Sequence, residues 1–329
     1  MKIFITGATG YIGRQVALHL ANKGHVLHAI VRSPKKAQLL QHPNIILFEG
    51  DLHQPERLSA AATGCDVCLH AAAYAAIYTK QIELFEEINI NGTKNVFNAA
   101  KTAGIKRFIL ISSAGIYGPS EGDIPVTENS VRKVTFFNEY ERTKAIADDW
   151  VLEQNSPEMT TLSLNLTRVY GPGQLTEANA GTRLIQQVIQ GWRIIPGDGK
   201  NIGNYVFIDD VVQACENALT LGNGGNRYII GGENLSFDEY FGAVKQATNA
   251  RQKMIYTPVW LIMAVSYIML LLAHLGRTPL ITPQWAKRYM KNWILNSAKA
   301  QTELNHSPTA FEVGVKKTVA WLQNGSPLN

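Results

Sequence analysis

Cysteine is scarce in this sequence, with three residues in a chain of 329. Three cysteines cannot build a disulfide framework, which favours a reducing compartment. Cys65 and Cys68 form a C-x-x-C pair, but neither a helix start nor a second pair of metal ligands accompanies them. We therefore expect no metal site. A free cysteine packs as a small apolar side chain, so we expect a structural role for both residues, with Cys68 in a buried strand.

Clusters of charge of one sign are also missing. The net charge is only +5 and the Lys and Arg residues are scattered, which argues against a nucleic-acid partner. There is no low-complexity tract, and the hydrophobic fraction of 46% is that of an ordinary globular protein with a sizeable core. Met1 and Lys2 lead straight into an apolar run that lacks the layout of a signal peptide, so we expect a cytoplasmic protein.

The first half of the chain alternates short apolar runs with amphipathic segments. We expect strands at 2–8, 25–32, 44–52, 66–73, 107–113 and 159–171, and helices at 11–24, 34–40, 55–64, 85–104 and 140–154. Such alternation predicts an α/β fold with a doubly wound parallel sheet covered by helices on both faces. Folds of this class bind ligands at the C-terminal ends of their strands.

The turn after the first expected strand contains three glycines at a spacing of three, in "TGATGYIG". Gly7 allows a tight turn, Gly10 lets a pyrophosphate approach the backbone, and Gly13 lets the following helix pack close to the strand. The helix N-terminus offers free N–H groups to the phosphates. A glycine turn that opens the first β-α unit of a long α/β pattern predicts a dinucleotide site.

The end of the second strand indicates which dinucleotide binds. NAD-binding chains usually place Asp or Glu there to hold the ribose hydroxyls. This chain has Arg32 instead, and a guanidinium can pair with a 2′-phosphate. We therefore favour NADP, with NAD as the alternative and a solvated Arg32 as the plainer interpretation. Asp51, at the end of the third strand, either contacts the adenine or caps the next helix.

The candidate catalytic residues lie in the middle of the chain. Ser113 ends a strand, and Tyr140 and Lys144 are four residues apart in "YERTK", which places them on one face of a helix. A lysine beside a tyrosine favours the phenolate and lowers the tyrosine pKa, so Tyr140 is a candidate general acid/base. Ser113 could hold the substrate oxygen. The alternative is a surface Tyr–Lys pair without function.

These motifs together resemble the extended short-chain dehydrogenases/reductases, the superfamily that includes nucleotide-sugar epimerases. The similarity covers nearly the whole chain, through "TGATGYIG", "GDL", "HAAA", "ISSAGIYG", "YERTK", "NLTRVYGPG" and "NYVFIDDVVQA". It implies a catalytic triad of Ser113, Tyr140 and Lys144, with Tyr140 and Lys144 also at the cofactor. Besides the residues above, it implies a cofactor groove that includes Thr9, Tyr11, Ile12, Leu52, Ala71, Ala72, Ala73 and Val169.

The resemblance also implies a division of the chain. We expect residues 1–170 to form the Rossmann domain that binds NADP. Residues 171–329 would be mostly a smaller substrate-binding region, with a segment at about 203–230 that returns to the Rossmann sheet. Asn89 matches an asparagine that supports the strand ends at the active site, and Asp209 and Asp210 match a structural motif.

Departures from the superfamily patterns narrow the chemistry. Ser113-Ala114-Gly115 lacks the carboxylates that sugar dehydratases use, and the stretch before Asp209 has Asn204 and Tyr205 where epimerases often have an Arg. The pattern is closer to proteins similar to dihydroflavonol reductase and 3β-hydroxysteroid dehydrogenase. We therefore expect an NAD(P)-dependent oxidoreductase that interconverts a ketone and a secondary alcohol. A nucleotide-sugar epimerase with tightly bound NAD is the alternative, and a nucleotide-binding sensor ranks last.

Residues 254–275 contain no Asp, Glu, Lys or Arg. The run is long enough to cross a bilayer, but Pro258 stands at its start and polar residues interrupt it. We expect a largely buried helix over the substrate pocket, with Trp260, Met263, Tyr267, Met269 and 270–272 as a pocket wall. The alternative is a surface that makes a peripheral contact with a membrane or joins two copies in a homodimer. Both interpretations favour a small-molecule substrate that is hydrophobic.

Overall fold

The main sheet of the computed structural model is a seven-stranded parallel sheet. The structure describes residues 1–132, 135–274 and 276–324. Within them the strand order is β3-β2-β1-β4-β5-β6-β10, and every neighbouring pair is parallel. The strands are β1 (Lys2–Thr6), β2 (Val26–Val31), β3 (Ile45–Glu49), β4 (Val67–His70), β5 (Arg107–Ser113), β6 (Thr160–Leu166) and β10 (Asn226–Ile230). This arrangement confirms the doubly wound α/β fold.

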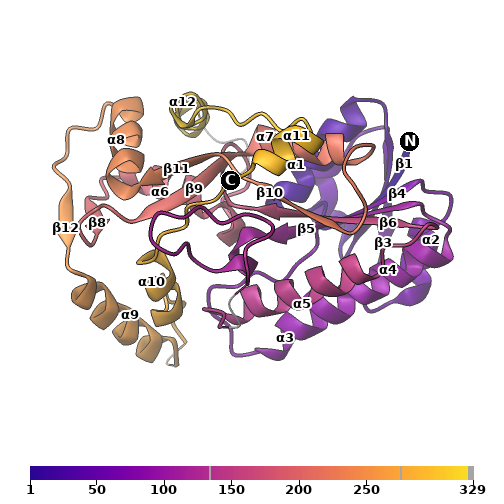
Figure 1. Ribbon diagram of the computed structural model, residues 1–329, viewed down its shortest axis with the longest axis horizontal. Coiled ribbons are helices and arrows are strands. Elements are labelled where there is room, and N and C mark those ends of the chain that lie inside the picture. Colours follow the sequence, from indigo (N-terminus) through magenta and orange to yellow (C-terminus); the bar gives the residue numbers. More distant parts are fainter. Residues whose placement is uncertain (133–134, 275, 325–329) are drawn as a thin grey trace.

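Helices cover both faces of the sheet (Figure 1). On one side lie α2 (Pro55–Ala62), α3 (Glu83–Glu86), α4 (Thr93–Thr102) and α5 (Glu139–Glu153). On the other side lie α1 (Tyr11–Asn22), α7 (Ile208–Ala218) and α11 (Ala298–Glu303). A π-helical segment, Glu87–Gly92, joins α3 to α4, so the expected single helix at 85–104 has a wider turn near its start. Short 3₁₀ segments span Pro34–Leu40, Ala114–Tyr117 and Glu177–Asn179.

The expected strand at 159–171 is two strands. β6 ends at Leu166, and β7 (Arg168–Tyr170) leaves the main sheet to pair with β9 (Ile202–Phe207). Thr167 lies at the break, where its N–H donates to the carbonyl of Ile230 at the end of β10. The continuous apolar pattern of this stretch hides the break, because both of its halves are buried.

A second, smaller sheet is built from the later part of the chain. β9 pairs with β7 in parallel and with β11 (Glu233–Ser236) in antiparallel fashion. Of the segment expected to return to the Rossmann sheet, β10 therefore does so, whereas β9 belongs to the second sheet. The same end of the molecule contains α6 (Ala180–Ile189), α8 (Phe237–Thr248), α10 (Pro283–Tyr289), α12 (Phe311–Gln323) and the two-stranded pair of β8 (Ile194–Pro196) and β12 (Ile255–Thr257). The proposed division near residue 170 stays a prediction.

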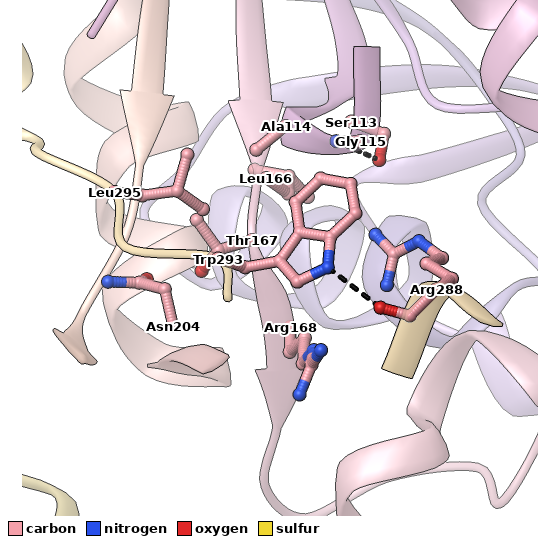
Figure 2. Close-up of a pocket in the computed structure, with 10 residues that line it drawn as sticks. All are labelled: Ser113, Ala114, Gly115, Leu166, Thr167, Arg168, Asn204, Arg288, Trp293 and Leu295. Carbon is pink, nitrogen blue, oxygen red and sulfur yellow. Dashed lines mark hydrogen bonds between the residues drawn. The ribbon is translucent and has the colours of Figure 1, made fainter. Parts of the chain in front are cut away.

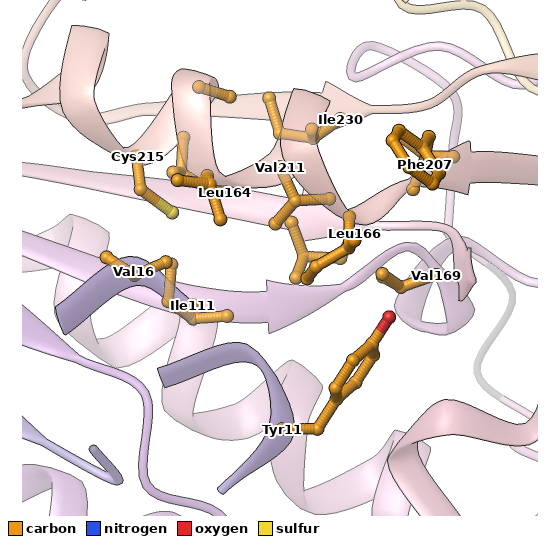
Figure 3. Packing of buried hydrophobic residues seen from close by; sticks show 14 of the residues in the cluster. Tyr11, Val16, Ile111, Leu164, Leu166, Val169, Phe207, Val211, Cys215 and Ile230 are labelled. Carbon is orange, nitrogen blue, oxygen red and sulfur yellow. The ribbon is translucent and has the colours of Figure 1, made fainter. Parts of the chain in front are cut away.

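One continuous apolar core joins the two parts of the chain (Figure 3). Val16 of α1 and Cys215 of α7 lie over Ile111 of β5 and Leu164 of β6, all with less than a tenth of their surface exposed. The core continues past Leu166 to the aromatic cluster that includes Phe207 and Phe311. Burying such side chains is the main favourable term in folding, at about 25 cal/mol per Å² of apolar surface.

The C-x-x-C pair behaves as the strand pattern predicts. Cys68 lies within β4 and Cys65 just before it, and both are buried and unpaired. Burial raises the pKa of the Cys65 thiol to about 11 and also raises that of the Cys68 thiol well above its ordinary value. Neither thiol is therefore a nucleophile at neutral pH, because the reactive form is the thiolate.

The uncharged run at 254–275 is not a buried helix. It forms β12 and α9 (Val259–His274), and Leu275 lies outside the described residues. Most of α9 faces solvent: Trp260 and Leu271 are each 69% exposed. The sequence shows no apolar period here because nearly every residue is apolar, so it could not reveal which face packs inward. Among the described residues, no helix has both the length and the apolar character needed to cross a membrane.

Candidate active site

The glycine turn joins β1 to α1, and backbone atoms lie very close to two of its three glycines. Gly7 has a φ of +73°, and a Cβ there would lie 2.5 Å from the backbone nitrogen of Ala72. A Cβ on Gly13 would lie 2.2 Å from the carbonyl oxygen of Gly7. Any side chain at Gly7 or Gly13 would therefore push α1 away from the end of the sheet.

Gly10 is the open member of the turn. It is exposed, and its Cβ position meets only the Gly7 carbonyl oxygen at 3.3 Å. Gly10 is also the N-cap of α1, and as a glycine it has no side chain to cap that helix end. The first N–H groups of a 12-residue helix thus remain available beside a glycine that leaves room for a ligand. These features fit the pyrophosphate of a dinucleotide.

The other expected cofactor residues lie along the same edge, because parallel strands end together. Arg32 follows β2, Asp51 and Leu52 follow β3, and Ala71 to Ala73 follow β4. Arg32 is exposed and forms no ion pair or hydrogen bond with the residues that the structure describes. Asp51 accepts a hydrogen bond from the N–H of His53 at 3.1 Å in the loop before α2, and because the N-cap of that helix is Gln54, Asp51 does not cap it.

Three expected cofactor residues have packing roles in this structure. Tyr11 is buried, and its hydroxyl donates to the carbonyl of Gly171 at 3.2 Å, which ties α1 to the loop after β7. Val169 is buried in β7. Leu52 packs against Gly92 of the π-helical segment. By contrast, Thr9 is exposed and Ile12 is half-buried.

The structure brings the three candidate catalytic residues together. Ser113 is the last residue of β5, and Tyr140 and Lys144 lie one turn apart near the start of α5. The side chain of Asn138 caps α5 by accepting from the N–H of Glu141 at 2.9 Å. Lys144 is fully buried, and its Nζ donates to the carbonyl of Ile111, two residues before Ser113, at 2.8 Å.

The pKa of Tyr140 differs from the sequence-based expectation. Burial raises it to about 12, while Arg288 and a hydrogen bond with Ser113 oppose that rise. Lys144 is not among the groups that lower it. Burial reduces the pKa of Lys144 itself to about 8. The expectation that Lys144 lowers the tyrosine pKa is therefore wrong for this arrangement. Burial of the phenol raises its pKa more than any nearby cation lowers it, and the cation that acts on it is Arg288. A tyrosine with this pKa is a proton donor at neutral pH.

A buried hydrogen-bond chain links the glycine turn to the catalytic helix. Nδ1 of His70 lies 2.6 Å from Oγ1 of Thr6, and Nε2 of His70 lies 2.9 Å from Oγ1 of Thr93. Because the Thr93 hydroxyl donates to the carbonyl of Asn89 at 2.7 Å, it must accept from His70. His70 therefore has a proton on Nε2. Burial, with a smaller effect of Lys144, lowers the His70 pKa to about 3.

Asn89 continues this chain to α5. Its amide nitrogen donates to Oγ1 of Thr143 at 3.0 Å and to the carbonyl of Tyr74 at 3.1 Å. Its amide oxygen accepts from the N–H of Tyr74 at 2.7 Å. These bonds fix the segment after β4 against the helix that carries Tyr140 and Lys144. The supporting position expected for Asn89 is thus the one it takes.

A pocket opens beside Ser113 (Figure 2). Its lining is Ser113, Ala114, Gly115, Leu166, Thr167, Arg168, Asn204, Arg288, Trp293 and Leu295. No residue of α9 is among them, so the expected pocket wall at Trp260, Met263, Tyr267, Met269 and 270–272 is wrong. The chain turns away after β12, and α9 packs against α10 at the edge of the molecule.

Sequence reasoning missed the two arginines of this pocket. Arg168 lies in β7, donates to the Tyr205 hydroxyl at 3.0 Å, and has a buried Nη2 without a hydrogen-bond partner among the described residues. Arg168 belongs to the "TRVYGPG" motif, but the motif does not show that its side chain lines a pocket. Arg288 lies in α10, with its guanidinium carbon 4.1 Å from the ring centre of Trp293. No local pattern marked Arg288, which is 175 residues from Ser113 in the chain.

Arg288 also connects the C-terminal region to the catalytic helix. Its Nε donates to Oε1 of Glu141 at 2.5 Å, and Glu141 is buried next to Tyr140. A buried carboxylate needs such a partner, because an unpaired charge in a protein interior is costly. Asp210 of α7 forms a comparable link to the segment before α12, because its carboxylate accepts hydrogen bonds from the N–H and the hydroxyl of Thr309. Its neighbour Asp209 is exposed.

Comparison with known proteins agrees with this geometry. Residues 3–231 match the model of the family described as "NAD dependent epimerase/dehydratase family". A putative dihydroflavonol 4-reductase of Synechocystis is 25% identical over 98% of this chain and 94% of its own length. A 3-beta-hydroxysteroid dehydrogenase of Mycolicibacterium neoaurum is 26% identical over 93% of this chain and 87% of its own.

A solved structure shows the same fold. The UDP-glucose 4-epimerase of Thermotoga maritima superposes with a TM-score of 0.81 at 22% identity and covers 98% of this chain and 99% of its own. At 22% identity, this similarity is evidence for the fold alone. The family match spans more than half of the chain, however, and it includes the glycine turn and the Ser-Tyr-Lys cluster. The chain therefore belongs to the NAD-dependent epimerase/dehydratase family, the extended short-chain dehydrogenases/reductases, and is an NAD(P)-dependent enzyme.

Proposed function

We propose that this enzyme interconverts a ketone and a secondary alcohol by hydride transfer. The observation that carries the proposal is the convergence of Ser113, Tyr140 and Lys144 at the end of β5, beside the pocket and at the same sheet edge as the glycine turn. When bound, the nicotinamide supplies or accepts the hydride. Tyr140 gives its proton to the substrate oxygen in reduction, and Ser113 holds that oxygen by a hydrogen bond.

The proposal places the dinucleotide along the C-terminal edge of the sheet. Gly10 and the start of α1 would hold the pyrophosphate, and Lys144 would hold the ribose next to the nicotinamide. Arg32 pairs with a 2′-phosphate, which makes NADP the preferred cofactor. Two features support this preference: the side chain of Arg32 is exposed without a partner among the described residues, and no carboxylate stands at the end of β2.

A hydrophobic substrate remains part of the proposal, but its support now comes from the pocket itself. Leu166, Trp293 and Leu295 give the pocket an apolar side, and Trp293 is 2% exposed. Apolar walls favour apolar ligands by about 0.8 kcal/mol for each CH₂ group buried. We therefore expect bulky hydrophobic ketones to be better substrates than sugar nucleotides.

One observation favours the second candidate, a nucleotide-sugar epimerase. Arg168 and Arg288 both line the pocket, and the unpartnered Nη2 of Arg168 is a donor that a diphosphate could use. The sequence argument against an epimerase rested on a missing arginine before Asp209, and β7 and α10 supply arginines from elsewhere. An epimerase would use the same three catalytic residues and keep its cofactor bound.

Cofactor consumption separates the two candidates. Purified enzyme is mixed with NADPH and a panel of bulky ketones, and absorbance at the nicotinamide band is followed. UDP- and dTDP-sugars are incubated in parallel without added cofactor, and the products are separated by chromatography. Ketone reduction that stops in the Tyr140→Phe variant supports the reductase. Sugar epimerisation without any ketone reduction would overturn it and establish the epimerase.

A further inference from the structure

The outer face of α9 is an exposed apolar surface on a helix without any charged residue. We define this face as Trp260, Ala264, Tyr267, Ile268 and Leu271, which lie on one side of the helix at spacings of three, four and one. Tyr267 and Ile268 are 50% and 56% exposed, in addition to the strongly exposed Trp260 and Leu271. Large contiguous apolar surfaces on a folded protein mark an interaction site.

The opposite side of α9 already packs on the protein. Ser266 and Ala273 are buried, and the Ser266 hydroxyl donates to the carbonyl of Met263 at 2.7 Å, so its polar group is satisfied. The helix packs against α10 at one end of the molecule (Figure 1). The inner face is thus paired, whereas the outer face remains uncovered.

Both ends of α9 are fixed to the same folded unit. Before it, β12 pairs with β8, and after it, α10 is held to α5 by the Arg288–Glu141 ion pair. The helix has 16 residues and is therefore about 24 Å long, shorter than the roughly 30 Å hydrocarbon core of a bilayer. If α9 crossed a bilayer, the chain after it would lie on the opposite side of the membrane, whereas these contacts hold the segments before and after α9 on the same side. The helix can therefore lie along the surface of a bilayer but cannot span it.

The charges around α9 indicate what that surface is. Residues 240–302 contain eight Lys and Arg residues and no Asp or Glu, whereas the rest of the chain has a net charge of −3. Five of these cations are exposed and form no ion pair within the described part of the chain: Arg251, Lys253, Arg277, Lys287 and Lys291. They lie just before β12, just after α9, and in and after α10.

We propose that the outer face of α9 docks onto an anionic membrane surface, with the helix parallel to the membrane plane. An apolar face flanked by cations is the composition that binds an interface carrying negative lipid headgroups. A second copy of the chain fits less well, because a symmetric dimer through this face would place two equally basic regions together. The nearby acid Asp238 already accepts from the Tyr256 hydroxyl at 2.9 Å.

Docking at α9 would place the pocket's α10 wall close to the lipid. Arg288 in α10 lines the pocket, and α9 packs on α10. A hydrophobic substrate dissolved in the membrane would thus have a short path to Ser113. This consequence rests on the proposed function, whereas the docking itself does not.

Flotation with lipid vesicles tests the docking. Full-length protein is mixed with vesicles of phosphatidylcholine alone or with about 30% phosphatidylserine. We expect the protein to float with the anionic vesicles and at least ~10-fold less with the neutral ones, with binding that weakens at high salt. The double variant Trp260→Ser/Leu271→Ser should lower binding at least ~10-fold. Its matched control, Ile124→Ser/Val313→Ser, alters two exposed apolar residues elsewhere and should bind as the parent does.

A charge pair completes the test. Lys253→Glu/Arg277→Glu should weaken binding to anionic vesicles, and Lys101→Glu/Lys316→Glu, with the same change in net charge, should not. Circular dichroism and thermal unfolding show whether each variant is folded. Absence of binding to any vesicle would overturn the proposal, as would binding that survives the loss of Trp260 and Leu271. A dimer, seen by light scattering, that these changes dissociate without any vesicle binding would assign the face to a second copy instead.

Discussion

Arg288 of α10 and Glu141 of α5 form an ion pair, with 2.5 Å between Nε and Oε1, immediately beside the tyrosine of the active site. The pair couples a helix of the C-terminal region to the helix that carries Tyr140 and Lys144. It also places two opposite charges near one phenol: Arg288 lowers the pKa of Tyr140, and Glu141 raises it. The electrostatics of the proposed reaction therefore depend on a residue far from the catalytic motif.

Arg288→Met should slow alcohol oxidation more than ketone reduction. Oxidation needs Tyr140 as a base, and a higher tyrosine pKa reduces the phenolate fraction at any pH below it. We expect kcat for oxidation to fall several-fold, up to about tenfold if the tyrosine pKa rises by one. Reduction uses the protonated tyrosine and should keep its kcat. Equal losses in both directions would show that Arg288 acts only through packing or substrate binding.

The double variant Arg288→Met/Glu141→Gln is the matched control for this experiment. It removes both charges, which act on Tyr140 in opposite directions, so oxidation should recover toward the parent rate. Stability should follow the same order. The single variant leaves a buried carboxylate unpaired and should lose about 3–5 kcal/mol of unfolding free energy, and the double variant should lose less. Urea unfolding measures the difference.

Tyr140→Phe should lower turnover at least ~100-fold, the usual scale for a positioned acid/base. Only the phenolic oxygen is removed, and Tyr140 has no part in the glycine turn, so binding of the dinucleotide should persist. Fluorescence titration with NADPH checks the binding, and absorbance checks the turnover. Tyr11→Phe is a useful comparison, because it removes a buried hydroxyl bonded to Gly171 and should affect stability rather than the chemical step. Normal turnover in Tyr140→Phe would exclude the assigned role.

Lys144→Met should abolish activity, and it should also remove the free-energy cost of burying a charged amine. The folded-state pKa of Lys144 is about 8, below its ordinary value of 10.5. The charged amine therefore opposes folding fully below pH 8, and this cost disappears as the pH rises toward 10.5. A folded-state pKa that is lower by one corresponds to about 1.4 kcal/mol of lost stability. The unfolding free energy of the parent should rise relative to that of Lys144→Met between pH 8 and pH 10.5.

Urea unfolding at several pH values measures this linkage. Lys101→Met, at an exposed position, serves as the control and should follow the parent at every pH. Parallel stability curves for the parent and Lys144→Met would mean that the buried amine is not desolvated as the structure indicates.

Arg32→Asp should reverse the cofactor preference. The exchange replaces a partner for the 2′-phosphate with an acceptor for ribose hydroxyls, so NADPH binding should weaken while NADH binding stays equal or improves. Because Arg32 is exposed and has no partner among the described residues, the variant should fold normally. Titrating both cofactors against both proteins gives the result. Arg193→Asp, an exposed change in the smaller region, should leave the preference as it is, and an unchanged preference in Arg32→Asp would leave Arg32 as a solvated residue.

The sequence alone determined the features that depend on neighbours in the chain. Alternating apolar runs specify the parallel sheet, because strands covered on both faces need apolar side chains throughout. Gly7, Gly10 and Gly13 specify the turn, since their spacing is set by the geometry of one strand and one helix. Tyr140 and Lys144 share a helix face because they are four residues apart. Each of these patterns can be read from a short stretch of neighbouring residues.

Tertiary structure decided what depends on distant contacts. The break at Thr167 follows from the partner that β7 finds in β9, and the pocket arginines come from β7 and from α10. The pKa of Tyr140 depends on burial and on Arg288, so the spacing to Lys144 could not give its direction. A helix as uniformly apolar as α9 has no periodic pattern to distinguish its inner from its outer face. Only its packing on α10, and the chain's return through the Arg288–Glu141 pair, place that apolar surface in the open.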